Sequence, residues 1–457
     1  MKKLLAILLI LGVVVGGVVF AQDEAPKASI SFGGWGRAAF SPLVVQGYGG
    51  GEKGEDALVG VGTGPGWDGI GAAVGFEVHG KNATENIGFD AKLRFDSGNG
   101  KYYANDSTAG VWVKPFGNIL KITGGQFQVD DLRGKIGGPS ETQSVGSYFG
   151  GDEDAIITRF ESGKAGAHFA LYPVDGFSIH ASFGSSGKLG DAFGQWDSDG
   201  AGDAKPISDA ASIYGALHVG AGYAIPNIGF ARVQYIGGKY NKNPNLTYGG
   251  KAGDGNGKVQ AAFQLTAVEG LNAELGLDFG IPVAPGEHDP AYTVNSMPVG
   301  YKDTYQPPIG IVLAAKYAAG DLGVLFRTRA LLGESVKIDG VSDPYEGGLK
   351  LEIGVEPTYK IAGIGTLGVD LSFGTKATDK QGSNDSKNGY SDLGLGAWWQ
   401  ADIGGGAFRI GIAANIPAAG DDNSKYGKDT GLMDAGKNKS NGTYFTIPIV
   451  WTYSIYP

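Results

Sequence analysis

Short segments in which every second residue is apolar recur along most of this chain. The clearest runs from Leu271 to Phe279, where Leu, Ala, Leu, Leu and Phe alternate with Asn, Glu, Gly and Asp. Successive side chains of a β-strand point to opposite faces, so this segment has one oily face and one polar face. Segments of about ten such residues, with an aromatic near each end and glycine-rich connections, are typical of transmembrane β-barrels. The pattern predicts an all-β fold, a closed antiparallel transmembrane β-barrel.

The predicted strands come in pairs joined by short turns, and long polar loops separate the pairs. A first strand at 29–40 and a last strand at 444–456 enclose eight pairs: 70–78 with 87–95, 111–116 with 119–127, 165–172 with 177–183, 213–223 with 228–235, 259–267 with 271–279, 309–317 with 322–330, 349–359 with 367–373, and 393–401 with 408–416. If 155–160 extends the strand that follows it, the total is about 18, an even number as in bacterial single-chain barrels. Totals of about 16 to 20 stay open.

The N-terminal residues predict export. Lys2 and Lys3 are followed by an apolar run from Leu4 to Phe20 and by a small-residue site ending at Ala21. This layout is that of a secretory signal peptide, so residues 1–21 are predicted to be cleaved and 22–457 to form a single transmembrane barrel domain. An uncleaved anchor is the alternative. After Phe20 no apolar run approaches the length of a spanning helix, so a mature chain in a bilayer must cross it as closed strands. Short turns are then predicted in the periplasm, and long loops outside a bacterial outer membrane.

Composition narrows the classes of function. Glycine is the commonest of the 457 residues at 82, cysteine is absent, and 47 acidic residues exceed 37 basic ones, for a formal net charge of -10. Nucleic acid does not fit as a partner, because neutralising phosphates needs clustered Lys and Arg. The five histidines form no His-x-x-x-His pair, so no metal and no other cofactor is expected. No Gly-x-Ser-x-Gly motif occurs, and the chain is not expected to be an enzyme.

Aromatic residues stand at two levels of the apolar faces. Tyr223, Tyr317, Tyr359 and Trp399 precede short turns, and Phe95, Phe183, Phe279 and Phe373 precede long loops. An amphipathic ring is most stable at a membrane interface, so two such sets predict the girdles of a barrel. At about 3.3 Å per residue and a tilt of about 40°, the segment from Leu271 to Phe279 is roughly 20 Å tall, close to the height of an apolar band. The alternative is that these rings belong to the core of a soluble β protein.

Over essentially its whole mature length the chain resembles a bacterial outer-membrane porin, in layout rather than in a catalytic motif. The segment from Phe445 to Ile455 is similar to the aromatic last strand that such proteins present to the barrel assembly machinery. It departs from that pattern at Pro448, which interrupts the ladder, and at the ending Tyr456-Pro457. The segment GQFQVDDLRGK at 125–135 is similar to outer-membrane barrel proteins of spirochaetes. The resemblance implies a barrel surrounded by outer-membrane lipid, as a monomer or a homotrimer.

In a closed barrel of this kind the polar faces line the lumen. The residues predicted for the pore wall are Arg37, Lys92, Arg94, Glu274, Asp278, Arg327, Arg329 and Asp370. Arg232 is ambiguous because it shares its face with Phe230. A wall of mixed charge is wet, which disfavours a greasy tunnel for fatty acids.

The third long loop, at about 128–154, is the predicted constriction of the pore. The loop is glycine-rich and carries the charged residues Asp130, Asp131, Arg133, Lys135, Asp152, Glu153 and Asp154. In porins the third loop commonly folds into the barrel. The resemblance therefore implies that its carboxylates face the wall residues Arg37, Arg94, Arg327 and Arg329. A solvated surface loop is the alternative.

These features predict an outer-membrane channel through which small hydrophilic solutes diffuse. The alternative is a surface-exposed barrel that acts in adhesion or envelope structure, with its polar loops as binding surfaces. A barrel enzyme, with a triad assembled from distant strands, is a third hypothesis. Acidic loops favour cations at the pore mouth, whereas a basic excess on the wall favours anions, so the ion preference stays open.

Overall fold

The structure is a computed structural model that describes residues 28–46, 58–62, 70–98, 101–104, 108–133, 157, 159–162, 165–185, 196–198, 204–206, 217–237, 257–281, 292–294, 297–299, 304–306, 308–333, 335–337, 345–378, 380–381, 384–385, 389–417 and 444–455. Helices that are long and apolar enough to cross a membrane are absent from this part of the chain.

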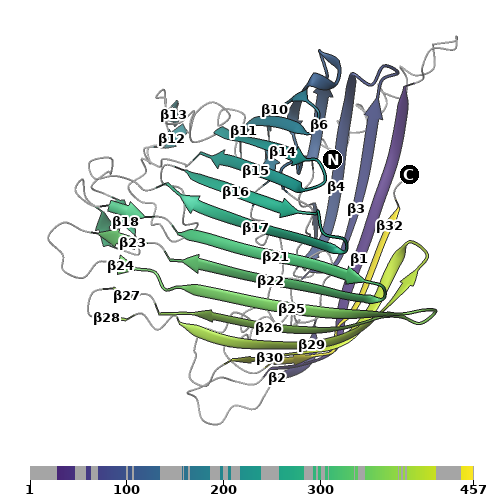
Figure 1. The fold of residues 1–457 in the computed structure, drawn as a ribbon, viewed down its shortest axis with the longest axis vertical. Helices are drawn as coiled ribbons and strands as arrows, with labels where there is room; N and C mark the ends of the chain where they lie inside the picture. The colour runs from purple at the N-terminus through teal and green to yellow at the C-terminus, as the bar shows by residue number, and fades with distance from the viewer. Residues whose placement is uncertain are drawn as a thin grey trace.

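Eighteen of the described strands form one closed antiparallel barrel (Figure 1). Strands pair in chain order, and the circuit closes where β1 pairs with both β3 and β32. The purple and yellow ends of the sheet therefore lie side by side in Figure 1. The wall strands are β1 (Ser29–Gln46), β3 (Ile70–Lys81), β4 (Ile87–Gly98), β6 (Thr108–Val113), β7 (Leu120–Gln126), β10 (Ala165–Val174), β11 (Phe177–Ser185), β14 (Leu217–Ile225), β15 (Gly229–Ile236), β16 (Lys258–Leu265), β17 (Leu271–Gly280), β21 (Ile309–Ala319), β22 (Leu322–Leu332), β25 (Lys350–Ile361), β26 (Gly365–Lys376), β29 (Tyr390–Ile403), β30 (Gly406–Pro417) and β32 (Ile449–Ile455). The predicted fold class is confirmed.

The distribution of apolar side chains is the inverse of that in a soluble protein. In β17, Leu275 and Leu277 are 52 % and 47 % exposed, whereas Glu274, which precedes them on the opposite face, is 6 % exposed. The same holds in β26, where Leu371 is exposed and Asp370 is buried. Because side chains alternate between faces, each wall strand presents apolar residues outward and polar residues inward. Such an outer surface suits a lipid bilayer rather than water.

The outward aromatic residues lie where the sequence places them. Tyr223, Tyr317 and Tyr359 are exposed at the end of the barrel with the short turns, and Phe279 and Phe373 are exposed toward the opposite end. Two levels of rings bounding an apolar band are the girdles expected at membrane interfaces.

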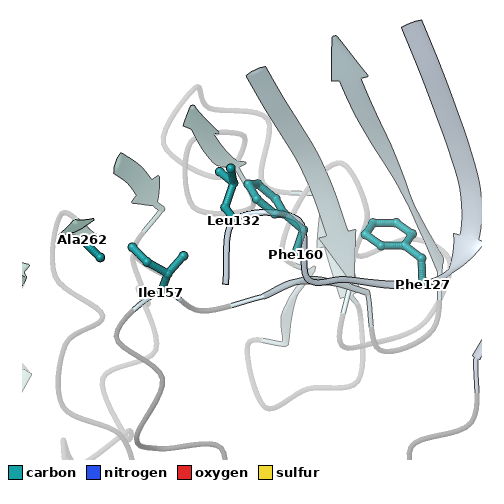
Figure 2. Close-up of a cluster of buried hydrophobic side chains, with 5 residues drawn as sticks. All are labelled: Phe127, Leu132, Ile157, Phe160 and Ala262. Carbon is teal, nitrogen blue, oxygen red and sulfur yellow. The ribbon is translucent and has the colours of Figure 1, made fainter. Parts of the chain in front are cut away.

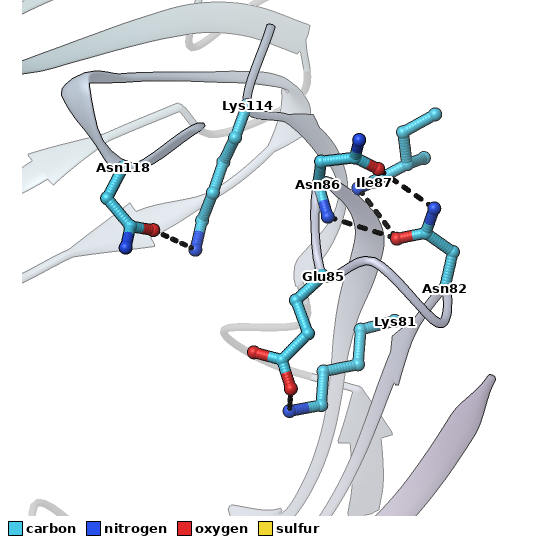
Figure 3. A network of polar contacts seen from close by, with 7 residues as sticks. All are labelled: Lys81, Asn82, Glu85, Asn86, Ile87, Lys114 and Asn118. Carbon is cyan, nitrogen blue, oxygen red and sulfur yellow. Dashed lines mark hydrogen bonds and ion pairs between the residues drawn. The ribbon is translucent and has the colours of Figure 1, made fainter. Parts of the chain in front are cut away.

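Polar side chains shape the short turn between β3 and β4 (Figure 3). Asn82 Oδ1 accepts hydrogen bonds from the backbone N–H groups of Asn86 (3.0 Å) and Ile87 (3.1 Å). Lys81 forms an ion pair with Glu85, which has a left-handed φ of 54°. The hydrogen bond from Lys81 and then its charge hold the pKa of the Glu85 carboxyl below its usual value. An Asn side chain that binds its own backbone stabilises a tight turn, so β3 and β4 are joined without a long loop.

Several sequence-based boundaries differ from the structure, and two of them lie near the third loop. Phe160, the last residue of the predicted extension 155–160, does not belong to β10; it lies in β9 (Phe160–Glu161), which pairs with β8 (Gln128–Val129) instead of the wall. The strand predicted at 111–116 ends at Val113, and the chain turns through the 3-10 helix η1 (Gly117–Ile119). Pro115 has no N–H for a continuing ladder, and Gly117 takes a φ of 62°.

Long loops pair with one another at the end of the barrel opposite the short turns. Five short strands in the described loops form one sheet: β20 (Thr304–Gln306), β23 (Ser335–Lys337), β24 (Tyr345–Glu346), β27 (Lys380–Gln381) and β28 (Asn384–Asp385). Hairpins join β12 (Trp196–Ser198) to β13 (Ala204–Pro206) and β18 (Tyr292–Val294) to β19 (Met297–Val299). The wall itself is extended by β2 (Leu58–Gly62), β5 (Lys101–Ala104) and β31 (Tyr444–Thr446).

The inverted surface predicts how charge is tolerated on β17. Leu275→Arg places a cation at mid-height on the lipid-facing side, where it should lower the free energy of unfolding by about 2–4 kcal/mol. Asn272→Arg adds the same charge on the inward face and should cost far less. Denaturant unfolding of both variants in lipid vesicles measures the difference. Equal losses would mean that the outer face of β17 does not meet lipid.

Candidate pore and loop constriction

The residues predicted for the pore wall all lie on the inward faces of their strands. Glu274, Arg327 and Asp370 are almost fully buried, and the others are half-buried on the face opposite the lipid-facing residues of their strands. They form two sectors: Arg37, Lys92 and Arg94 on β1 and β4, and Glu274, Asp278, Arg327, Arg329 and Asp370 on β17, β22 and β26. The wall order separates these sectors, so the residues are not gathered into one cluster.

The first sector is centred on the indole of Trp35. The guanidinium carbons of Arg37 and Arg94 lie 5.6 and 5.8 Å from its ring centroid, a range at which a cation is attracted to an aromatic face. The ring lies over Gly75 of β3, where a Cβ atom would stand 2.3 Å from the indole nitrogen. Glycine at this position therefore lets the large ring lie flat across the neighbouring strand. Lys92, on β4, lies opposite Glu77.

Two further inward tryptophans repeat this arrangement, although the sequence reasoning did not single them out. The ammonium groups of Lys114 and Lys121 lie 5.4 and 5.2 Å from the ring centroid of Trp112. The guanidinium carbon of Arg409 lies 3.8 Å from that of Trp398. Both rings lie over glycines of adjacent strands. A tryptophan at a polar position of the alternation, with glycine opposite, is the sequence signal that marks them.

The second sector contains a buried ion pair that resolves the ambiguity of Arg232. Arg232 Nη2 lies 2.6 Å from Glu274 Oε1, and the two side chains are 0 % and 7 % exposed. The pair reaches from β15 to β17 across β16, where Ala262, opposite Arg232, is small enough to leave space. Phe230 also points inward, where it packs against an apolar cluster inside the barrel, so sharing a face with Phe230 does not direct Arg232 to lipid.

The other carboxylates of this sector also have polar partners. Asp278 Oδ2 accepts hydrogen bonds from Lys258 Nζ (3.1 Å) and Gln260 Nε2 (2.9 Å). Glu352, opposite Arg329 in the register of β22 and β25, forms an ion pair with Lys350 at 2.8 Å. The inward wall is thus charged in both signs and internally paired.

An apolar cluster lies inside this charged barrel and contains part of the third long loop. Phe127, Leu132, Ile157 and Phe160 are buried together with Ala262 of the wall (Figure 2). We call the first four residues the loop anchor. Phe230 of β15 and Val312 of β21 pack against it from the wall. The two ends of the loop are joined by the pairing of β8 with β9, so the base of the loop is folded against the inner wall.

The wall accommodates the loop anchor through glycine and histidine. A Cβ atom at Gly220 of β14 would stand 2.7 Å from a methyl group of Leu132. The ring of Phe160 stacks on His218, with centroids 3.9 Å apart and planes at 18°. Its centroid also lies 5.3 Å from that of His168 and 5.4 Å from that of His180. We call these three histidines, on β10, β11 and β14, the histidine seat.

The described charges of the predicted constriction loop contact the loop itself and β10. Asp130 forms ion pairs with Arg133 (3.7 Å) and Arg159 (3.2 Å). Asp131 accepts a hydrogen bond from the Tyr172 hydroxyl (2.7 Å). The other predicted members of the loop, Lys135, Asp152, Glu153 and Asp154, lie outside the described residues.

The grouped histidines do not amount to a metal centre. In the residues that the structure describes, no set of three or more His, Cys, Asp or Glu side chains is arranged to hold a metal ion. The alternation of each strand places these histidines on an inward face, but it does not reveal that the loop rests on them.

Comparisons with known proteins find similarity only among solved structures, at low sequence identity. No family model matches the sequence, and no curated protein matches it. Among solved structures, an anion-selective porin from Comamonas acidovorans is 13 % identical with a TM-score of 0.49, covering 94 % of this chain and 100 % of that one. OpdL of Pseudomonas aeruginosa is 11 % identical with a TM-score of 0.46, covering 93 % and 99 %. OccAB4 of Acinetobacter baumannii is 8 % identical with a TM-score of 0.46, covering 95 % and 100 %. At such identities and TM-scores these likenesses assign no role to the chain, whose closed barrel is shown by its own strand pairing.

Proposed function

We propose that this protein is an outer-membrane channel through which small hydrophilic solutes diffuse. The observation that carries the proposal is the combination of an apolar outer surface with a charged inner wall in a closed barrel of eighteen described strands. A barrel of this size is wide enough to hold water inside unless a loop or plug fills it. Charged and amide side chains on the wall keep that interior wet.

The base of the third loop narrows the proposed pore. Its loop anchor is packed on the inner wall, so the chain between residues 133 and 157 starts and ends inside the barrel. The described base of the loop therefore takes up part of the lumen, and its charges lie close to the path proposed for solutes. Asp130, which is half-exposed and paired with Arg133 and Arg159, is one such charge.

The surroundings follow from the same surface. Outer-membrane lipid would cover the exposed apolar band, and the barrel assembly machinery would insert the exported chain after cleavage of residues 1–21. Whether the barrel acts alone or as a homotrimer is a question that the oligomeric state in mild detergent answers.

The channel hypothesis predicts stepwise currents. The mature chain, folded in detergent and added to a planar lipid bilayer, should give discrete open-channel steps whose size grows with salt concentration. Folding is checked independently by the β-type circular dichroism of the same sample. A folded barrel that inserts and stays electrically silent would contradict the channel and would favour the adhesion or envelope role, which ligand binding by the external loops would then test.

The opposite charges of Arg232 and Glu274 should cancel in their effect on the ion preference of the pore. Glu274→Gln leaves a net positive charge on the wall and should shift the reversal potential under a salt gradient toward anion preference. Arg232→Gln should shift it toward cations, and the double variant should return close to the starting value. A unit charge at 4 Å in water is worth about 1 kcal/mol, which corresponds to an up to about fivefold change in local counter-ion concentration.

Glu85 is the matched control for these charge changes, because it lies in an exposed turn rather than on the inner wall. Glu85→Gln should leave the reversal potential unchanged at high salt. A shift as large as that of Glu274→Gln would mean that the ion preference is set outside the barrel.

A further inference from the structure

The described base of the third loop rests on three histidines of the wall. We propose that protonation of the histidine seat releases the loop anchor, so that acid switches the base of the third loop from a docked to an undocked position. This inference rests on the proposed channel function, because it assigns a regulation to the same constriction. The device consists of His168, His180 and His218 on one side and Phe160 on the other.

The geometry of the histidine seat suits neutral imidazoles. His168 and His180 are 1 % and 0 % exposed, and His218 is 9 % exposed. His180 Nδ1 lies 3.2 Å from His168 Nε2. One of these two nitrogens must be bare to accept the hydrogen bond, so the contact cannot survive when both rings carry two N–H groups. Two protonated rings with centroids 5.4 Å apart would also repel one another.

The remaining ring nitrogens reinforce this constraint. His168 Nδ1, His180 Nε2 and His218 Nε2 are buried without a hydrogen-bond partner among the described residues. A protonated imidazole donates from both nitrogens, and a buried N–H without an acceptor is costly. The Phe160 ring attracts a cation weakly, but it offers no acceptor to these groups. Withdrawal of the loop anchor would let water reach them.

Charged and polar groups on each neighbouring element set the balance. From the loop, Asp131 faces His168 and His180 and favours their protonation, while it also accepts the Tyr172 hydroxyl. Lys121 of β7 faces His168, and its positive charge opposes protonation of that ring. Lys258 of β16, paired with Asp278, opposes protonation of His218, and Gln234 of β15 lies in hydrogen-bonding contact with that ring. A single carboxylate near three imidazoles cannot neutralise more than one of them.

The direction of the pH effect follows from proton binding. Undocked histidines are in water and take up protons near the ordinary imidazole value of about 6.5, whereas the docked seat holds fewer protons. The docked state is therefore fully favoured above about pH 6.5 and is lost as the pH falls below it. The ratio of docked to undocked loop should change by up to about tenfold per pH unit for each histidine involved.

Single-channel recordings at about pH 7.5 and about pH 5.0 lie on either side of that value and test the proposal. The wild-type channel should show one steady level at the higher pH. At the lower pH it should switch between levels, with the docked level at least about tenfold less populated. The triple variant His168→Gln, His180→Gln, His218→Gln should lose this pH dependence. Retention of the switching in the folded triple variant would overturn the proposal.

His79 is the matched control. It is a histidine on the inward face of β3, paired with Asp90 at 2.8 Å and away from the loop anchor. His79→Gln should keep the wild-type switching at low pH. Loss of the switching in this variant would place the proton sensor elsewhere and would overturn the proposal.

Phe160→Ala provides a test that does not depend on the triple variant. Without the stacked ring the loop should undock at both pH values, so switching should already occur at about pH 7.5. Steady currents in this variant at both pH values would contradict the proposal that Phe160 holds the loop anchor on the histidine seat.

Hydrogen–deuterium exchange tests the release of the loop anchor independently of the channel function. In detergent micelles, peptides covering 127–133 and 159–162 should exchange faster at the lower pH, relative to a β17 peptide and after correction for the intrinsic pH dependence of exchange. Faster exchange in a barrel that carries no current would support acid release of the loop anchor and contradict the channel function. Unchanged exchange in a conducting barrel would contradict acid release of the loop anchor and leave the channel function intact.

Discussion

The pairing of backbone groups in lipid is the constraint on which the rest of this structure depends. Hydrocarbon offers no partner to an N–H or C=O group, so strands that cross it must be paired on both sides. The register of β1 with both β3 and β32 completes that circuit. Closure then fixes which face of each strand meets lipid, because a slip of one residue would turn every apolar side chain into the lumen. The alternation along the chain is thus a consequence of closure.

Closure also creates a crowded inner face, and small residues make that face possible. Ala262 lets the Arg232 side chain reach Glu274 across a strand, and Gly75 lets the Trp35 ring lie flat on its neighbour. A buried charge is tolerated only when a partner meets it, since removing one member of such a pair costs about 3–5 kcal/mol. The many glycines of this chain thus do more than form turns, because some of them provide the space in which large polar and aromatic groups lie.

The barrel could be predicted from the sequence, but only part of the inner wall could. Strands such as 271–279 were predictable because their alternation records the two environments directly. The inward direction of Arg232 was not predictable, since Phe230 on the same face packs against residues about 70 and 100 positions earlier in the chain. The failure of 155–160 as a wall strand has the same cause: Phe160 is apolar because it enters the lumen, not because it meets lipid. The histidine seat depends on the registers of β10, β11 and β14, which the pattern of one strand does not contain.

The loop anchor is apolar because it must attach the loop to the wall in an aqueous environment. In a water-filled lumen an exposed ion pair contributes only about 0–1 kcal/mol, so charges alone would leave a long loop free to move. Burying a side chain such as Leu132, Ile157 or Phe160 contributes about 1.5–3 kcal/mol each, enough together to offset part of the ordering cost. The attachment is therefore made by apolar side chains at the two ends of the loop. Charges such as Asp130, which is 55 % exposed, are left at the surface of the loop base.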